Sequence, residues 1–520
     1  MKLKDYLIVT LLTLISPFIH GYYFGFIDQD FYLPYLNKII NPALYQNDYM
    51  FIQGHWAYSL FNYFIVFLKK ITGLDLAGTD FLLFIITLWL LYLAIYSLTK
   101  TIYKKHEIAF LATFLFLVPK WAAQIGHMTH QFYFVSRDLS LALSLLALNY
   151  LLRRQFISSF LLILVATFTN LSIPVPVGLL WVWLWLKKQK KFPLFAFINL
   201  GQNQAWLEIL RERGTYSFPH LWRWTSWGNF GLFLSLLGTS WLVLKDKLFS
   251  KYAYEMKLFL KICAGVFLFN FVITAIVPII GLIQLQLVRT VNFIFIIALI
   301  TFAAASYQLI SFGPRLVKLA SLLAVTGVYF WGDHLTGWHF VIIWALPALL
   351  ILFPRLLKLK SRKFSYLNLF LILVLLVNLF IKLIIIKPQV FWPYYWHYPN
   401  VSISVTDFPN WLAIQVWAKQ NTPPETVFLT PPSLHGFRSF SQRSIIGDLK
   451  DGAVVFYTWE YTKLWQDKMI TLKNYTQFRE SDFLKIQQQY PFQYLIVTSS
   501  HPVLNFQLVY KNSDFSIYKI

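Results

Sequence analysis

The chain has 520 residues, of which 58% are hydrophobic, 19% aromatic and only 13% charged, and its mean hydropathy is +0.56. A soluble protein carries about a quarter charged residues, and apolar runs near the length of a bilayer crossing recur along most of this sequence. The composition therefore predicts a polytopic membrane protein. The net charge of +23 comes from short basic clusters between apolar runs, which is the pattern that orients helices against the cytoplasmic face, so we exclude a nucleic-acid partner.

The N-terminal region predicts an uncleaved first helix. Residues 6–19 are apolar and follow Lys2 and Lys4, but no small-x-small cleavage site comes after them. The N-terminus is then cytoplasmic. The single cysteine, Cys263, lies in an apolar run, which excludes a disulfide framework and a cysteine metal site.

Residues 21–54 carry three acids among many aromatic side chains: Asp28, Asp30 and Asp48. Asn41-Pro42 marks a turn, so we expect a loop with short helical pieces, followed by an amphipathic interfacial helix at 55–71. Carboxylates at the mouth of a membrane bundle are candidates for function, because an unpaired charge there is costly. The alternative is that they are solvated loop residues.

Alternation of apolar runs with basic clusters predicts the other crossings. We expect them at residues 80–99, 108–118, 132–152, 156–169, 176–186, 230–244, 258–280, 291–309, 319–331, 339–353 and 366–386. The charges also require a weak or broken crossing around 192–200, which is tolerated only where protein or a cavity satisfies its backbone. The first helix brings the expected total to thirteen crossings, with the C-terminus outside.

The composition changes after residue 387. Helices are expected at 411–419, 459–470 and 482–489, and short strands at 427–429, 444–446, 494–497, 508–510 and 515–518. This alternation predicts a small extracytoplasmic α/β domain. We therefore divide the chain into an all-α transmembrane domain, residues 1–387, with an acidic outer loop at 21–79, and a C-terminal soluble α/β domain, residues 388–520.

No phosphate-cradling glycine loop, CxxC pair, HExxH or GxSxG occurs in the sequence, so the candidates are polar residues on the outer side. Arg289 is either an interfacial anchor or a guanidinium fork for a phosphate. Arg137 lies at membrane depth and either assists Arg289 or forms an ion pair with Asp138. Arg438 and Arg443 compete for the phosphate, because Arg438 lies in a turn that could face the bundle.

Motifs at the two ends of the chain, together with its layout, resemble a known family. The motifs are Asp28-Gln29, Leu33-Pro34, Asn41-Pro42-Ala43-Leu44-Tyr45 and Asp48 in the first loop, and Trp417-Ala418, Asn421-Thr422-Pro423, Phe428-Leu429-Thr430-Pro431-Pro432 and Gly436-Phe437-Arg438 near the C-terminus. The chain is similar to the GT-C superfamily of integral membrane glycosyltransferases, and within it to a bacterial, mostly uncharacterised subgroup. The resemblance covers nearly the whole chain in layout but is specific only at its ends.

The resemblance implies a sugar donor on a polyprenyl phosphate, a glycan, lipid or protein acceptor, and a location among the lipids of the bacterial inner membrane. In this superfamily an acid of the first loop activates the acceptor hydroxyl, which gives Asp28 as the predicted general base. Better-known members have Asp-Glu or Asp-Asp where this sequence has Asp28-Gln29-Asp30, so Asp30 stays open as the base. Asp48 would position the acceptor or a cation.

The sequence predicts no cofactor and no metal site, although it leaves a divalent cation at the acids open. Two rival functions also remain. The first is a non-catalytic protein that binds lipid-linked glycans, and the second is a transporter or flippase for such lipids. A transporter is expected to have paired half-chain repeats, and the sequence has none.

Overall fold

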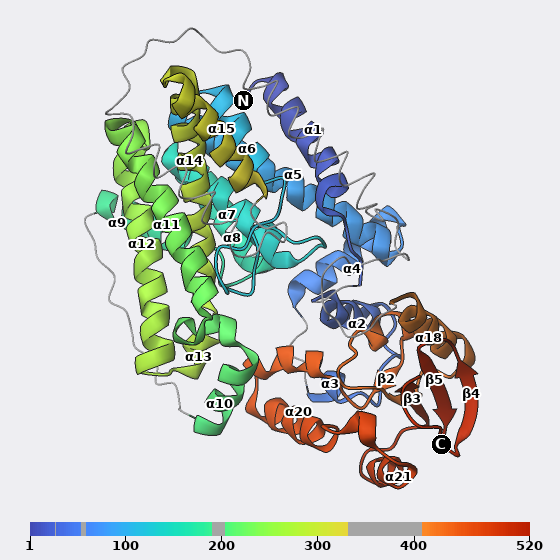
Figure 1. Cartoon of the computed structure of the whole chain (residues 1–520). Coiled ribbons are helices and arrows are strands. Elements are labelled where there is room, and N and C mark those ends of the chain that lie inside the picture. Colours follow the sequence, from blue (N-terminus) through green and yellow to red (C-terminus); the bar gives the residue numbers. More distant parts are fainter. Residues whose placement is uncertain (26–27, 54–58, 190–202, 331–407) are drawn as a thin grey trace. The chain divides into compact units, whose positions relative to one another are not determined.

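The computed structural model describes residues 1–25, 28–53, 59–189, 203–330 and 408–520, and these form two compact units (Figure 1). The helical unit comprises Met1–Tyr22, Leu82–Gln202 and Gly214–Val390. The sheet unit comprises Tyr23–Phe81, Asn203–Arg213 and Phe391–Ile520. The crossings expected at 192–200, 339–353 and 366–386 lie outside the described residues.

The helical unit is built from apolar helices. They are α1 (Leu3–His20), most of α5 (Leu76–Tyr103), α6 (His106–Leu115), α7 (Ser136–Leu152), α8 (Phe156–Thr169), α9 (Val175–Gln189), α11 (Trp224–Leu244), α12 (Ala253–Phe271), α13 (Ile280–Ile283), α14 (Val291–Phe312) and α15 (Arg315–Phe330).

Within the described part of the chain, five segments are long and apolar enough to cross a membrane. They are Leu3–His20, Leu76–Tyr103, Trp224–Leu244, Ala253–Ile276 and Ile280–Phe312. Several such segments in one chain identify an integral membrane protein. The total of thirteen crossings stays a prediction.

Proline residues explain where two helices end short of the predicted crossings. The run expected at 108–118 forms a helix of 10 residues, His106–Leu115, which stops ahead of Pro119. The run expected at 258–280 is helical only to Phe271, continues as a π-helical turn, Val272–Ile276, and ends before Pro278. The residue before a proline is disfavoured in the helical region, so both runs stop early.

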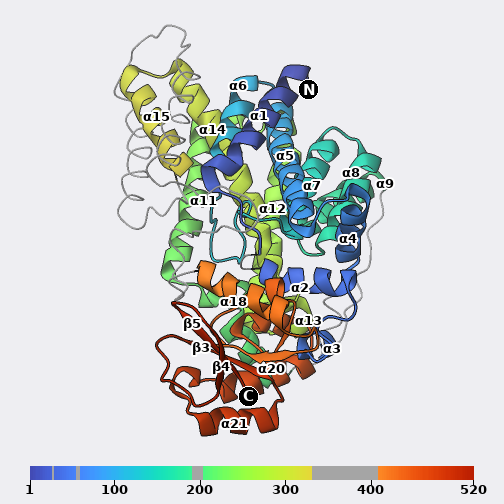
Figure 2. The same ribbon diagram turned by 90° about the vertical axis from the view of Figure 1, so that its right-hand side faces the viewer.

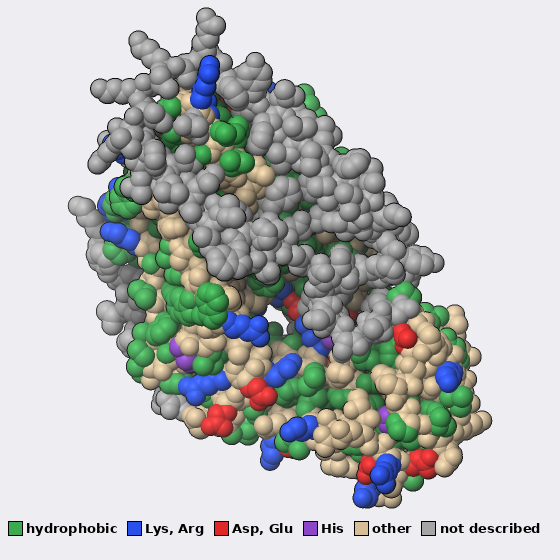
Figure 3. All heavy atoms as spheres, viewed as in Figure 1, with side chains coloured by type: hydrophobic (Ala, Val, Ile, Leu, Met, Phe, Trp, Pro, Cys, Tyr) green, Lys and Arg blue, Asp and Glu red, His purple; other side chains and the backbone are tan. Residues whose placement is uncertain are grey.

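Burial divides the helices of this unit into two kinds. The side chains of α14 are buried without interruption from Val291 to Ser306, and α6, α11 and α15 pack against it (Figure 2). A helix that is apolar on all sides belongs in a core. Other helices expose large apolar side chains, such as Ile157 on α8 (78% exposed) and Leu268 on α12 (62%), and Figure 3 shows hydrophobic surface of this kind. Exposed apolar surface on this scale fits contact with lipid.

The sheet unit combines helices from three separate stretches of sequence. They are α2 (Gln29–Ile40), α3 (Tyr49–Gln53), α4 (Leu60–Thr72), α10 (Gln204–Arg213), α18 (Phe408–Asn421), α19 (Phe437–Ser441), α20 (Trp459–Thr471) and α21 (Glu480–Gln489). We expected only short helical pieces before residue 54, but α2 has 12 residues and contains Pro34. An internal proline costs a helix about 3 kcal/mol, which burial of Phe31, Leu33 and Leu36 offsets here.

The predicted C-terminal sheet is present with its strands close to the expected positions. The strands are β1 (Val427–Leu429), β2 (Ser444–Ile445), β3 (Tyr494–Thr498), β4 (Gln507–Lys511) and β5 (Phe515–Lys519), in the order β2-β1-β3-β5-β4. β2, β1 and β3 are parallel, whereas β5 runs antiparallel to β3 and β4.

Alternate side chains of β1 and β3 enter different hydrophobic cores, as the period of two in a strand requires. Phe428 and Ile496 belong to the core beneath α18 and α19, and Leu429 and Val497 belong to the core beneath α21. Helices therefore cover both faces of the sheet, which the near-continuous apolar strands β1 and β3 need.

The first loop is part of the sheet unit. α2 contacts α19 and the 3-10 helix η10 (Leu449–Phe456), and α10 contacts η10 and α20. From the sequence we grouped this loop with the transmembrane domain, but in the structure it packs on the C-terminal domain. Asn37 on α2 donates a hydrogen bond to the carbonyl of Ser439 (3.1 Å), and Tyr45 donates one to the carbonyl of Arg438 (2.8 Å).

Candidate active site

The helical start of α2 separates the first two acids. Asp28 is the residue immediately before the helix, and Asp30 is in its first turn. In an extended loop their side chains would point the same way, whereas in a helix they diverge. Each carboxylate therefore contacts a different basic side chain of the C-terminal domain, Asp28 contacting Lys450 and Asp30 contacting His435.

Asp28 forms an ion pair with Lys450, which lies in η10. The Lys450 Nζ is 2.8 Å from Asp28 Oδ1, and 22% and 23% of the two side chains are exposed. A partly exposed pair of this kind contributes at most about 1 kcal/mol to stability. Both charged groups of this pair therefore keep part of their surface exposed.

Asp30 forms a second pair with His435, through Oδ2 and the ring Nδ1. Only 6% of the Asp30 side chain is exposed, against 25% of His435. Burial lowers the pKa of His435, but the nearby carboxylates of Asp30 and Asp448 outweigh it, so the pKa lies above its ordinary value of 6.5. Asp448 and Lys450 therefore both lie near enough to His435 for their charges to act on its imidazole.

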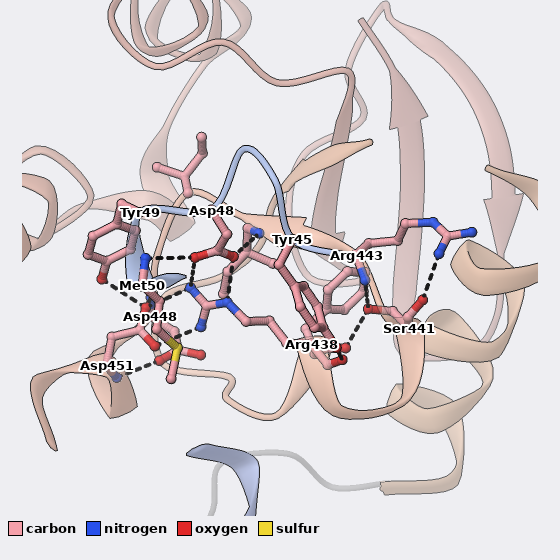
Figure 4. Close-up of polar contacts among 12 residues, drawn as sticks. Tyr45, Asp48, Tyr49, Met50, Arg438, Ser441, Arg443, Asp448 and Asp451 are labelled. Carbon is pink, nitrogen blue, oxygen red and sulfur yellow. Dashed lines mark hydrogen bonds and ion pairs between the residues drawn. The ribbon is translucent and has the colours of Figure 1, made fainter. Parts of the chain in front are cut away.

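Asp48 lies in a fully buried ion network (Figure 4). It accepts hydrogen bonds from Arg438 Nε (2.6 Å) and Nη2 (3.1 Å) and from the backbone amides of Met50 and Ile445 (both 3.0 Å). Asp451 binds the other side of the same guanidinium at 2.7 and 3.0 Å. The bonds between Asp48 and Arg438 join the first loop to the C-terminal domain. Asp48 and Asp451 together use both hydrogen-bonding edges of the Arg438 guanidinium.

Arg443 caps the C-terminal end of α18. Its guanidinium donates to the carbonyls of Lys419 (2.8 Å) and Thr422 and to the Thr422 hydroxyl (3.0 Å). These are the carbonyls that a helix C-terminus leaves without helical partners. Arg438 and Arg443, predicted as phosphate ligands, both donate hydrogen bonds to groups of the protein itself.

A polar cluster in the helical unit contains the other predicted arginines. His127, between α6 and α7, binds Asp138 Oδ1 through Nε2 at 2.5 Å, and its Nδ1 lies 2.8 Å from the Asn292 amide nitrogen. Asp138 therefore pairs with His127. Arg137 and Arg289 both lie near enough for their charges to act on the imidazole of His127. The two arginines thus lie in the surroundings of the buried His127, Arg137 itself buried and Arg289 half-buried.

Sequence reasoning missed the partners of the loop acids. His435 directly precedes the Gly436-Phe437-Arg438 motif, and Lys450 and Asp451 follow in Asp448-Leu449-Lys450-Asp451-Gly452. Nothing in a single sequence links them to acids about 400 residues away. The only hint in the sequence is that His435 and Lys450 lie in the same polar segment as Arg438, a predicted phosphate ligand.

No group of three or more His, Cys, Asp or Glu side chains suited to a metal ion occurs among the residues that the structure describes. We name no metal ligand. Asp28 and Asp30 instead contact a lysine and a histidine, side chains that can carry or exchange protons.

Comparison with known proteins gives three results. The profile of a family described as "Domain of unknown function (DUF6798)" matches residues 409–471, which include His435, Arg438 and Lys450. No curated protein matches the chain. Among solved structures, the oligosaccharyltransferase of Archaeoglobus fulgidus, crystallised with a tethered acceptor peptide, is similar with a TM-score of 0.41 and 13% identity. The likeness covers 96% of this chain and 69% of that one and is weak, so the function proposed below rests on the residues of the site.

Proposed function

We propose that this chain is a membrane glycosyltransferase of the GT-C type. It would transfer a sugar from a polyprenyl phosphate to a hydroxyl of a glycan, lipid or protein acceptor on the extracytoplasmic face. The observation that carries the proposal is the pairing of Asp28 with Lys450 and of Asp30 with His435 inside one unit of an integral membrane protein.

The chemistry of glycosyl transfer needs both kinds of group. An acceptor hydroxyl stays protonated near neutral pH, so attack on the anomeric carbon needs a side chain that takes the proton as the bond forms. The departing phosphate gains negative charge, which fixed cations stabilise. Carboxylates and an imidazole serve the first need, and an ammonium group serves the second. Direct attack opposite the phosphate would invert the anomeric carbon.

Replacement of the acids tests the proposal. A strain that lacks the protein should accumulate a polyprenyl-phosphate sugar, and the wild-type gene should clear it. Asp28→Asn and Asp30→Asn keep the side-chain shape but lose the charge, so turnover should fall by about 10²–10⁴-fold. Lipid extracts analysed by mass spectrometry give the readout. Asp75→Asn, an exposed acid of the same unit, is the matched control and should clear the lipid normally.

The outcomes separate the rival functions. Normal clearance by both Asn variants would contradict a transferase that uses these acids and would favour a glycan-binding protein. A lipid that accumulates on only one side of the membrane, with unchanged total amount, would favour a flippase. Loss of clearance in both Asn variants, with normal protein levels, supports transfer.

We also propose, for the helical unit by itself, that Arg289 binds the donor phosphate with the help of Arg137. Arg137 and Arg289 place two positive charges around His127 against the one carboxylate of Asp138, and a guanidinium matches phosphate with two parallel hydrogen bonds.

Binding of farnesyl phosphate to the purified full chain tests this second proposal, with farnesol as the uncharged reference. A hydrogen bond to a charged group contributes about 1.5–3 kcal/mol, so Arg289→Ala should weaken binding roughly 10-fold or more. Arg289→Lys should recover part of the loss, because it keeps the charge but not the fork. Arg153→Ala, at an exposed turn, is the control. Unchanged affinity in Arg289→Ala would exclude the role.

A further inference from the structure

His435 and Asp30 form a carboxylate–imidazole pair whose atoms have distinct tasks. An ionised carboxylate only accepts hydrogen bonds, so the Nδ1 that faces Asp30 Oδ2 carries a proton. The second ring nitrogen, Nε2, is then the one with a lone pair when the ring is neutral. With 25% of its side chain exposed, His435 keeps part of the ring open while its partner is buried.

The surrounding backbone is shaped for this pair. Gly436 has φ +84°, and a Cβ at this position would lie 2.5 Å from Asp30 Oδ1, so only glycine lets the carboxylate reach this place. The carbonyl of His435 accepts a hydrogen bond from the Trp411 indole (3.0 Å), and the next side chain, Phe437, is buried in the domain core. The backbone that carries the imidazole is therefore fixed at His435 itself and at the buried Phe437.

The charged groups around His435 come from two elements. Asp30 approaches from α2, and Asp448 and Lys450 approach from the start of η10, where Lys450 is also paired with Asp28. The carboxylates raise the pKa of His435 above 6.5 although burial opposes them. A general base is most effective when its pKa is near the working pH, which an imidazole in this setting satisfies better than an ordinary carboxylate.

We propose that His435 Nε2 takes the proton from the acceptor hydroxyl and that Asp30 is its positioning residue, an inference that rests on the proposed glycosyl transfer. As the hydroxyl oxygen bonds to the anomeric carbon of the donor, its proton moves to Nε2. The bond between that carbon and the phosphate oxygen breaks, and the oxygen keeps the electron pair. The imidazolium, stabilised by Asp30, then returns the proton to water. Asp28 lies beside this pair and orients the acceptor, while its partner Lys450 supplies the positive charge for the departing phosphate.

Chemical rescue tests the assignment on the purified full chain in lipid, with polyprenyl-phosphate sugar extracted from the deletion strain as donor. His435→Ala should slow transfer about 10²–10⁴-fold, and added imidazole should restore part of the rate, because the free base fills the space of the missing ring. His435→Gln should be equally slow but not rescued, since glutamine fills that space. His501→Gln, in the same domain, is the control.

The pH profile gives a readout that a structural role would not move. The base works when deprotonated, so the wild-type rate should rise with pH through the pKa of His435. Asp30→Asn removes the charge that stabilises the imidazolium, so the rising limb should move to lower pH. Gly436→Ala, which pushes Asp30 away, should act in the same direction, whereas Gly73→Ala, at φ +69° with nothing within 4 Å, should not.

Three results would overturn the inference. His435→Ala with the wild-type rate would exclude His435 while leaving the transferase function in place. Loss of the rising limb in Asp28→Asn, with the limb kept in His435→Ala, would make Asp28 the base. A wild-type chain that transfers no sugar from the extracted donor would overturn the proposed function and this inference with it.

Discussion

At the scale of single residues, burial separates the acids of the first loop. Asp48 has no exposed surface and accepts four hydrogen bonds, two of them from Arg438. The Asp28 side chain is 23% exposed, and its ion pair with Lys450 is partly exposed as well. The same residue type, 20 positions apart, is therefore fully buried in an ion network in one case and partly exposed in the other.

We expect Asp48→Asn to lower the free energy of unfolding by about 3 kcal/mol, because the change breaks a buried ion pair and leaves the Arg438 guanidinium partly uncompensated. Asp28→Asn should cost less than about 1 kcal/mol, since its pair is partly exposed. Thermal unfolding of both variants in the same detergent measures the difference. Equal shifts of the two unfolding temperatures would contradict this account of the network.

At the scale of elements, α10 is attached to the C-terminal domain. The Trp206 indole donates a hydrogen bond to the carbonyl of Val455 (2.7 Å), and the Arg213 guanidinium lies over the Trp465 ring at 5.1 Å. Because α10 packs on η10 and α20, it lies on the same side of the membrane as the C-terminal domain. The basic end of α9, which includes Lys187, is expected in the cytoplasm. With that expectation, the crossing predicted around residues 192–200 stays a prediction that the position of α10 makes testable.

Cysteine labelling tests this topology. In a Cys263→Ala background, an impermeant thiol reagent added to intact cells should label Glu208→Cys on α10 and Lys511→Cys on β4, both exposed positions. Lys187→Cys should react only after the cells are opened. Labelling of Lys187→Cys together with Glu208→Cys would remove the crossing expected around residues 192–200 and reverse the orientation of the helices that follow.

At the scale of the whole molecule, the sheet unit is assembled from stretches that are far apart in the chain. Residues 23–81 and 203–213 join the C-terminal domain, and the candidate active site exists only in that assembly. His435 and Lys450 come from one stretch and Asp28 and Asp30 from another. The apolar helices fix the protein in a membrane, while the chemistry proposed here belongs to the unit that contains the sheet.

The sequence alone determined the membrane class, most of the apolar helices and the strands of the C-terminal domain, because apolar length and the periods of helix and strand are local properties. It did not predict α10 or α19, which are short and polar or lie within a loop. It also singled out Asp28, Asp30 and Asp48 as acids in an acid-poor chain. It could not tell that Asp48 and Arg438 bind each other or that His435 stands against Asp30. Those contacts join residues about 400 positions apart, so only tertiary packing, with its burial and its close approach at Gly436, decides which charged groups meet.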